Sequence, residues 1–211
     1  KVNELVKNNI CLPHEIGYFS FTVKAAEEIR DRVAQGSEMS KDELKKEYPY
    51  FCTLHSLAYK QLQLRQGQIM DEQDYADLSR ITGHEYVNKM RKGNGVDISM
   101  PTAKSEYQDI CKLKKDRDKY EYVDYFTQFL KRKNPPKLKY LFVDEAQDLS
   151  VHQWRVVDMI QEIAKPIETY VAGDDDQAIF RWAGADIEHF IAMAKDDSNS
   201  IIPLTQSYRI P

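Results

Sequence analysis

An apolar run that ends in two carboxylates is the first feature of the sequence that points to chemistry. In the stretch LFVDEAQDLS, residues 141–150, Asp144 and Glu145 come directly after the run Tyr140 to Val143. Burying carboxylates costs free energy unless a metal, a partner charge or hydrogen bonds compensate. In such a place an aspartate can hold Mg²⁺, usually through its water, while the neighbouring carboxylate takes a proton from an attacking water. The simpler alternative is a strand that ends in two solvated acids.

Polar residues also follow the neighbouring predicted strands. Residues 173–177, with the sequence GDDDQ, follow the next strand, and residues 207–209, SYR, follow the last one. In parallel sheets ligands bind beyond the carboxyl ends of the strands, where the loops converge. Three further acids and Gln177 at that edge make two merely solvated acids a poor explanation. Arg209 could contact phosphate oxygens as arginine fingers do, or form a surface ion pair.

Aromatic and hydroxyl side chains mark the remaining loops at that edge. Phe180 and Trp182 lie in the polar stretch AIFRWAGAD, residues 178–186. Aromatic rings on a loop suit stacking on nucleic-acid bases, but they could equally fill a local core. Phe21-Thr22 and Thr53-Leu54-His55-Ser56 follow the first two predicted strands.

Strands and helices must alternate along the chain to place these residues at one edge. The patterns predict strands over 18–22, 48–53, 138–144 and 168–174, and another within 200–209. They predict helices over 1–9, over 24–34, from Ser56 onward and over 120–131. A further helix is predicted after the N-cap Ser150, through about Ala164. This alternation indicates an α/β fold with a parallel sheet covered on both faces. Charged helical segments between Gly67 and Pro136 indicate an inserted all-helical subdomain.

Length and composition are consistent with this architecture. The 211 residues allow one sizeable core, or one core with an inserted subdomain. The contents of 42% hydrophobic and 30% charged residues are those of a globular protein. No apolar run suits a membrane span or a signal peptide, so we expect a cytoplasmic protein without a membrane partner.

Cysteine spacing and net charge bear on disulfides, zinc sites and nucleic-acid binding. The three cysteines are widely spaced, which indicates reduced structural thiols rather than disulfides or zinc ligands. The net charge of −4 argues mildly against nucleic acid. Its distribution is uneven, however, because residues 60–136 hold 15 Lys and Arg against 12 Asp and Glu.

Five ordered motifs then resemble those of one family. FSFTVKAAEEIRDRV, TLHSLAYK, LFVDEAQDLS, VAGDDDQAIFRWAGAD and LTQSYR occur in the order and at the spacing of the superfamily 1 DNA helicases of the UvrD, Rep and PcrA type. The resemblance implies a P-loop NTPase (RecA-like) sheet flanked by helices. It also implies a division into a motor domain formed by residues 1–64 and 137–211, with a helical subdomain over 65–136.

The resemblance implies ATP and Mg²⁺ as cofactors and gives the site residues roles. Asp144 would bind Mg²⁺, and Glu145 would be the base that activates water. Gln177 would sense the γ-phosphate, Arg209 would stabilise its developing charge, and Tyr208 would stack on the adenine.

Single-stranded and duplex DNA are the partners that the resemblance implies. Phe21, Phe180 and Trp182 would form pockets for successive bases, while Thr22, Thr53 and His55 would contact the DNA backbone. Taken alone, His55 is more simply explained as a hydrogen-bonded structural histidine. Three positions depart from the family pattern, Val23, Ala183 and Ser207, and put one DNA contact in doubt.

One family motif does not occur in these residues. None of the eight glycines is followed by Lys, so the phosphate loop G-x-x-x-x-G-K-[ST] is absent from the sequence. We therefore expect a truncated piece of a helicase whose other part carries a second RecA-like domain. By family analogy the whole protein would move 3′ to 5′, and the piece alone would be inactive.

Three alternatives remain open from the sequence. The motor could be the front of a helicase-nuclease, or the short chain could be a DNA-binding relic without ATPase activity. The acid clusters could also form a metal-dependent phosphohydrolase, although Arg209, Gln177 and the aromatic loop would then have no role.

Overall fold

A four-stranded parallel sheet forms the centre of the molecule. The computed structural model describes residues 1–35, 39–83, 104–179 and 184–204. The strands are β1 (Ile16–Ser20), β2 (Phe51–Cys52), β3 (Tyr140–Asp144) and β4 (Glu168–Val171), in the order β2-β1-β3-β4. Every neighbouring pair is parallel, and Ser20 lies opposite Asp144. The predicted α/β class is confirmed.

Alternation along the strands divides the core between the two faces of the sheet. Phe19, Leu141 and Val143 belong to a cluster with α4 (Leu54–Leu62), α7 (Tyr122–Arg132) and α8 (Val151–Ala164). Tyr18 and Phe142 belong to a second cluster, with side chains from α1 (Val2–Lys7), α2 (Val23–Val33) and α3 (Lys41–Glu47). Since successive side chains of a strand point to opposite faces, both faces are covered by helices.

Side-chain caps start the helices that follow the strands. Thr22, Thr53 and Ser150 are the N-caps of α2, α4 and α8, and each accepts a hydrogen bond from the backbone N–H three residues further on. Such caps satisfy backbone donors that the first turn leaves free. The predicted cap at Ser150 and the predicted end of α8 at Ala164 are confirmed.

Short elements complete the described part of the chain. They are the 3₁₀ helices η1 (Pro13–Glu15), η2 (Gln66–Gln68), η4 (Ala146–Asp148) and η5 (Asp175–Gln177), and α9 (Ile187–Lys195). Among the described residues no helix is both long and apolar enough to cross a membrane.

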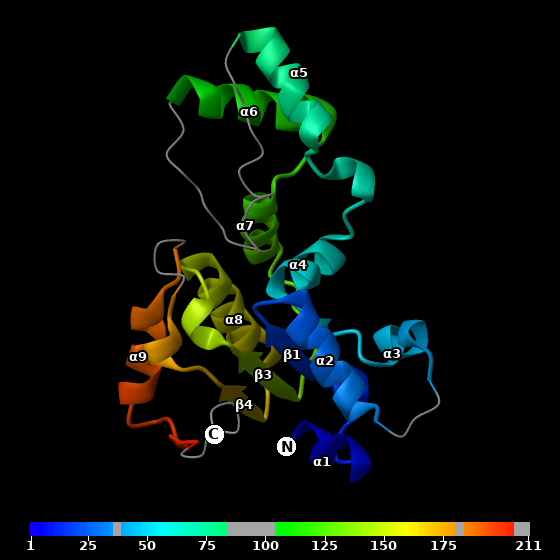
Figure 1. The fold of residues 1–211 in the computed structure, drawn as a ribbon, viewed down its shortest axis with the longest axis vertical. Coiled ribbons are helices and arrows are strands. Elements are labelled where there is room, and N and C mark those ends of the chain that lie inside the picture. The colour runs from blue at the N-terminus through cyan, green and yellow to red at the C-terminus, as the bar shows by residue number, and fades with distance from the viewer. Residues whose placement is uncertain (36–38, 84–103, 180–183, 205–211) are drawn as a thin grey trace.

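Two helices form a lobe that extends away from the sheet (Figure 1). We call α5 (Glu72–Thr82) and α6 (Lys104–Arg117) the helical lobe. Met70, Tyr75, Leu78, Ile110 and Leu113 make a separate small apolar cluster there. The inserted all-helical part predicted from the sequence is therefore present.

The two connections to the helical lobe are paired with each other. Met70 N–H donates to the Tyr120 carbonyl at 3.0 Å, and Tyr120 N–H donates to the Gln68 carbonyl at 2.7 Å. These bonds form an isolated parallel bridge between Ile69 and Tyr120. We call the paired segments 68–70 and 119–121 the neck.

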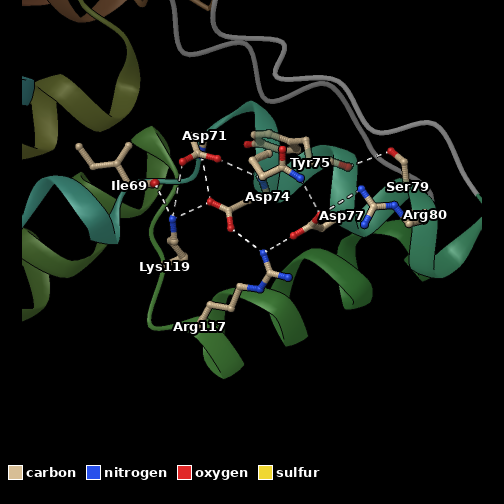
Figure 2. A network of polar contacts seen from close by, with 10 residues as sticks. Ile69, Asp71, Asp74, Tyr75, Asp77, Ser79, Arg80, Arg117 and Lys119 are labelled. Carbon is tan, nitrogen blue, oxygen red and sulfur yellow. Dashed lines mark hydrogen bonds and ion pairs between the residues drawn. The ribbon is translucent and has the colours of Figure 1, made fainter.

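Ion pairs join the helical lobe to the neck (Figure 2). Asp74, only 3% exposed, lies 2.9 Å from Arg117 Nη1 and 2.7 Å from Lys119 Nζ. Arg117 also contacts Asp77 at 2.9 Å. Burial alone would raise the pKa of Asp74. Hydrogen bonds from Lys119, the Asp71 backbone N–H and Arg117 outweigh this effect and hold the pKa below its ordinary value.

The last helix of the predicted insertion packs over the sheet, although its Asp124 also forms an ion pair with Lys114 of the lobe at 2.9 Å. Phe126 and Phe129 of α7 are fully buried in the cluster that α4 and α8 share. The sequence division at residues 64 and 136 stays a prediction, and α7 shows that this part of 65–136 belongs to the core over the sheet.

Two local expectations differ from the structure, and a third is only partly covered by it. The helix α3 was not expected, and the strand expected over 48–53 is only Phe51–Cys52, because Tyr48 ends α3. The strand expected within 200–209 does not include 200–204, which are not in a strand, and it stays a prediction because 205–209 lie outside the described residues.

Candidate functional site

The end of β3 places the two acids at the carboxyl edge of the sheet. Asp144 is the last residue of the strand, and Glu145 follows in the left-handed conformation, with φ of 53° and ψ of 45°. For a residue other than glycine this conformation costs about 1–3 kcal/mol, and such strain persists where surrounding contacts impose it. The strand therefore ends at Asp144, and the chain turns at Glu145 into η4.

A tyrosine from the neighbouring strand holds Asp144. The Tyr18 hydroxyl donates to Asp144 Oδ2 at 2.6 Å, and Glu145 N–H donates to Oδ1 at 3.1 Å. The Tyr18 ring stacks between Phe51 and Phe142, with centroids 5.7 Å and 6.3 Å away. Burial, together with the bond to Asp144, raises the pKa of Tyr18, so this hydroxyl stays a donor.

A buried glutamine connects Glu145 to the end of β4. Gln147 Nε2 donates to Glu145 Oε2 at 2.8 Å, and Gln147 Oε1 accepts from Asp174 N–H at 3.2 Å. The backbones are joined beside it, because Ala146 N–H donates to the Ala172 carbonyl at 2.9 Å. The ends of β3 and β4 are therefore tied by side chain and main chain.

Gln177 reaches the same network from η5. Its Nε2 donates to Asp174 Oδ2, and Asp174 Oδ1 accepts from Asp176 N–H at 3.1 Å. One hydrogen-bonded chain thus runs from Tyr18 through Asp144, Glu145, Gln147 and Asp174 to Gln177. The structure brings together three of the predicted site residues, Asp144, Glu145 and Gln177.

The acids of this edge have no basic partner within the described residues. No Lys, Arg or His of that part of the chain forms an ion pair with Asp144, Glu145 or Asp148. Asp148 is 9% exposed, and its Oδ1 has no hydrogen-bond partner there. Burial, with a smaller contribution from the Glu145 charge, raises the pKa of Asp148 to about 6. Among the described residues, this edge therefore has several carboxylates without a cation, and Asp148 Oδ1 is a buried acceptor without a donor.

The donor set at Asp144 fits a cation that is held mainly by other ligands. Within the described part of the chain no group of three or more His, Cys, Asp or Glu side chains could hold a metal ion. Mg²⁺ is commonly bound by one or two carboxylates together with waters and substrate phosphates. Each Asp144 oxygen accepts one hydrogen bond and retains a second lone pair, so this carboxylate suits such a role.

Four predicted site residues lie outside the described residues. They are Phe180 and Trp182, predicted to contact DNA, and Tyr208 and Arg209, predicted to contact ATP. Their roles stay predictions.

Three of the predicted DNA contacts lie at the ends of β1 and β2. Phe21 follows β1 and packs against the core cluster below it. Thr22 is exposed, whereas Thr53 is 8% exposed and its hydroxyl also contacts Ser56 Oγ at 3.0 Å. Because β1 and β2 are neighbours, these side chains share one side of the carboxyl edge. Their contacts with DNA stay predictions.

His55 is enclosed by aromatic rings. It is 6% exposed, and its ring centroid lies 4.6 Å from that of Tyr122 and 4.1 Å from that of Phe126. Burial lowers the pKa of His55 to about 3, so the ring is neutral at physiological pH. Nε2 finds no hydrogen-bond partner among the described residues, which does not support the simple explanation of a hydrogen-bonded structural histidine.

A comparison with known families decides the relationship. The family model described as the UvrD/REP helicase N-terminal domain matches residues 1–122 and 72–198. This chain belongs to that family. The resemblance noted in the five motifs is confirmed, and the parallel sheet agrees with it.

Individual relatives of the UvrD/REP helicase chain give the same result. ATP-dependent DNA helicase PcrA of Bacillus subtilis is 25% identical, over 93% of this chain and 31% of its own length. ATP-dependent DNA helicase Rep of Buchnera aphidicola is 25% identical over 93% of this chain and 36% of its own, and DNA helicase II of Rickettsia typhi is 26% identical over 99% and 37%. The chain spans about a third of the length of these curated relatives.

Three members of the site in this UvrD/REP helicase chain escaped the sequence reasoning. Gln147 and Asp174 lie within the motifs and Tyr18 directly precedes the first of them, yet the motifs indicate no role for any of the three. Gln147 stands two residues after Glu145, and its signal was its place between the two acids Glu145 and Asp148 in the turn that follows the strand. Tyr18 gave none, since an aromatic residue inside a strand indicates core packing.

Proposed function

We propose that this chain is the N-terminal motor part of an ATP-dependent DNA helicase. The supporting observation is the hydrogen-bonded chain from Tyr18 to Gln177, which joins the predicted ATP residues of two strand ends in one site. Membership of the UvrD/REP helicase family and relatives named as ATP-dependent DNA helicases support the same activity. ATP binds at the carboxyl edge of the sheet.

The residues at that edge divide the chemistry between them. Asp144 holds Mg²⁺ jointly with phosphate oxygens and water. When bound, the metal neutralises charge on the phosphates. Glu145 accepts the proton of the attacking water, and Gln177 contacts the γ-phosphate. Arg209 stabilises the charge that develops in the transition state, and Tyr208 stacks on the adenine.

Single-stranded DNA crosses the ends of β1 and β2 in this proposal. Phe21, Phe180 and Trp182 stack on bases, while Thr22 and Thr53 contact the phosphate backbone. His55 is neutral, so it contributes to DNA binding as a hydrogen-bond donor and not as a cation. Aromatic stacking of this type tolerates any base sequence, as a translocating motor requires.

The complete protein has more parts than these residues. We place a second RecA-like domain in it, with the ATP between the two motor domains and movement 3′ to 5′ on single-stranded DNA in the cytoplasm of a cell or of a phage-infected host. Residues 1–211 do not hydrolyse ATP by themselves, because they contain no G-x-x-x-x-G-K-[ST] loop for the β- and γ-phosphates.

Substitution of Glu145 in the complete protein tests the proposal. Glu145→Gln keeps the side-chain size and removes the base, so DNA-stimulated ATP hydrolysis falls by a factor on the order of 10² to 10⁴ while ATP binding is retained. Hydrolysis is measured by phosphate release, and binding with a fluorescent ATP analogue. Glu162→Gln on the exposed side of α8 is the matched control and leaves both unchanged. Full hydrolysis by Glu145→Gln would refute its role as base.

A further inference from the structure

Gln147 uses both ends of its amide within the site. It is 2% exposed and lies in η4, directly behind the turn at Glu145. Its Nε2 donates to the Glu145 carboxylate, and its Oε1 accepts from the Asp174 backbone. A side-chain amide carries a donor and an acceptor side by side, whereas a carboxylate has no donor and an ammonium group has no acceptor.

The surroundings of Gln147 leave its amide little room to move. A Cβ placed on Gly173 would lie 2.7 Å from Gln147 Oε1 and 2.9 Å from Phe190 Cζ. The absence of a side chain at Gly173 therefore lets the end of β4 approach the amide closely. The two backbones are already joined between Ala146 and Ala172, so a displacement of the β4 end is transmitted to Gln147.

We propose that Gln147 is a positioning residue that orients the Glu145 carboxylate and couples it to the segment carrying Gln177. This rests on the proposed function, in which Glu145 is the base and Gln177 contacts the γ-phosphate. The link runs from Gln177 to Asp174, from the Asp174 backbone to Gln147, and from Gln147 to Glu145. Gln147 itself touches neither substrate nor metal.

The hydrogen bond from Gln147 matters because a glutamate side chain without such a bond can occupy several rotamers. One donor bond of 2.8 Å to Oε2 selects a single rotamer and leaves Oε1 for the water. Misplacing a reacting group by about 1 Å can cost about 100-fold in rate. A phosphate that contacts Gln177 would therefore influence the orientation of the Glu145 carboxylate through Asp174 and Gln147.

Gln147→Met in the complete protein tests this inference. Methionine has similar volume but offers neither the donor nor the acceptor, so kcat for ATP falls about 100-fold while KM stays within about twofold. Gln153→Met is the matched control, because Gln153 is also buried, at 4% exposure, and its amide oxygen accepts from Ser150 N–H at 2.9 Å in the N-cap of α8. It lowers the melting temperature and leaves kcat per folded protein unchanged.

The double variant Glu145→Gln/Gln147→Met separates positioning from loss of structure. If Gln147 acts through Glu145, the second substitution leaves the residual rate of Glu145→Gln unchanged. A further loss of about 100-fold in the double variant would show that Gln147 acts independently and would overturn the inference.

A second variant covers the possibility that Gln147→Met fails to fold. Gly173→Ala keeps the Gln147 side chain, but the added Cβ would lie 2.7 Å from Gln147 Oε1 and displace the amide. This substitution should lower kcat when Glu145 is present and leave the residual kcat of Glu145→Gln unchanged. Wild-type kcat in a folded Gln147→Met or Gly173→Ala protein overturns the inference. Full hydrolysis by Glu145→Gln would instead refute the proposed function. In that case the contact between Glu145 and Gln147 could still be tested, because the changes in melting temperature of Glu145→Gln and Gln147→Met would not add up in the double variant.

Discussion

Carboxylates gather in two regions of this molecule, and the two regions treat them in opposite ways. At the neck and helical lobe, Asp74 and Asp77 share Arg117, and Lys119 completes the pairing of Asp74. At the carboxyl edge of the sheet, Asp144 and Glu145 have hydrogen-bond donors but no cation among the described residues. The lobe therefore neutralises its charges within the fold, while the sheet edge keeps its charge for a ligand.

The pKa values express the same contrast. The pKa of Asp74 is below its ordinary value because hydrogen bonds from Lys119, the Asp71 backbone N–H and Arg117 outweigh its burial. The pKa of Asp148, which is also buried, rises to about 6 because its burial is not offset. Burial of a charge is compatible with stability only when a partner compensates it. Paired acids here serve architecture, and unpaired acids mark the site.

The largest effect is expected where a buried acid loses one of its two cations. Lys119→Met leaves Asp74 with Arg117 alone and removes the bond from Lys119 Nζ to the Ile69 carbonyl. Breaking a buried pair on one side costs about 3 kcal/mol of unfolding free energy. Urea unfolding measures the loss, and hydrogen exchange of the α5 amides shows whether it is confined to the helical lobe.

An exposed pair provides the control for that experiment. Arg32 and Glu28 form an ion pair whose side chains are 65% and 55% exposed. Arg32→Met should change the unfolding free energy by less than about 1 kcal/mol. Equal losses for Lys119→Met and Arg32→Met would remove the distinction between the buried network and the surface.

An intermediate effect of opposite sign is expected at the sheet edge. The pKa of Asp148 is raised from 3.8 to about 6 in the folded protein, so the folded state binds the proton more tightly than the unfolded state and stability falls as the pH rises between those values. The shift corresponds to about 3 kcal/mol, and partial solvent screening reduces the cost of the ionised carboxylate above about pH 6 to about 2 kcal/mol. Asp148→Asn, which is neutral throughout, should therefore be more stable than the natural protein at about pH 8 and equally stable at about pH 4.

Urea unfolding at both pH values, without nucleotide or Mg²⁺, tests the Asp148 prediction. A stabilisation that is the same at both pH values would mean that the Asp148 charge is already compensated. In that case the unpaired character of the sheet edge would be refuted at its most buried acid.

The smallest effect is expected at Tyr18. Tyr18→Phe removes the 2.6 Å bond to Asp144 Oδ2 and should lower the unfolding free energy by about 1 kcal/mol, the net worth of a hydrogen bond. Tyr48→Phe is the control, because Tyr48 packs on the same Phe51 ring without bonding Asp144. If the two variants lose the same stability, Tyr18 acts only through its ring.

Patterns within single segments allowed much of the fold to be predicted. The apolar run before Asp144 gave β3, and Ser150 gave the start of α8, because a buried strand and a side-chain cap are local properties. The helix α3 was missed although its signal was also local, since Ser40 and Glu43 form a capping box. The strand expected within 200–209 stays a prediction, because 200–204 are not in a strand and 205–209 lie outside the described residues.

The site was predictable only as a set of strand ends. Asp144, Glu145 and Gln177 could be placed at one edge because parallel strands end together. The contacts of Gln147 and Tyr18 could not, because they depend on the register of β3 against its neighbours and on the turn at Glu145. Residue types alone do not specify which atoms lie within 3 Å across two strands.

The neck has a consequence for how such a chain can vary. The polypeptide leaves and re-enters the sheet layer through two segments already bonded at Ile69 and Tyr120, and α4 and α7 on either side pack together. The entropic penalty of closing a loop grows only slowly with its length. Insertions or deletions beyond the neck would therefore leave the carboxyl edge of the sheet untouched, so the lobe can change in length between related chains while the strand ends keep their arrangement.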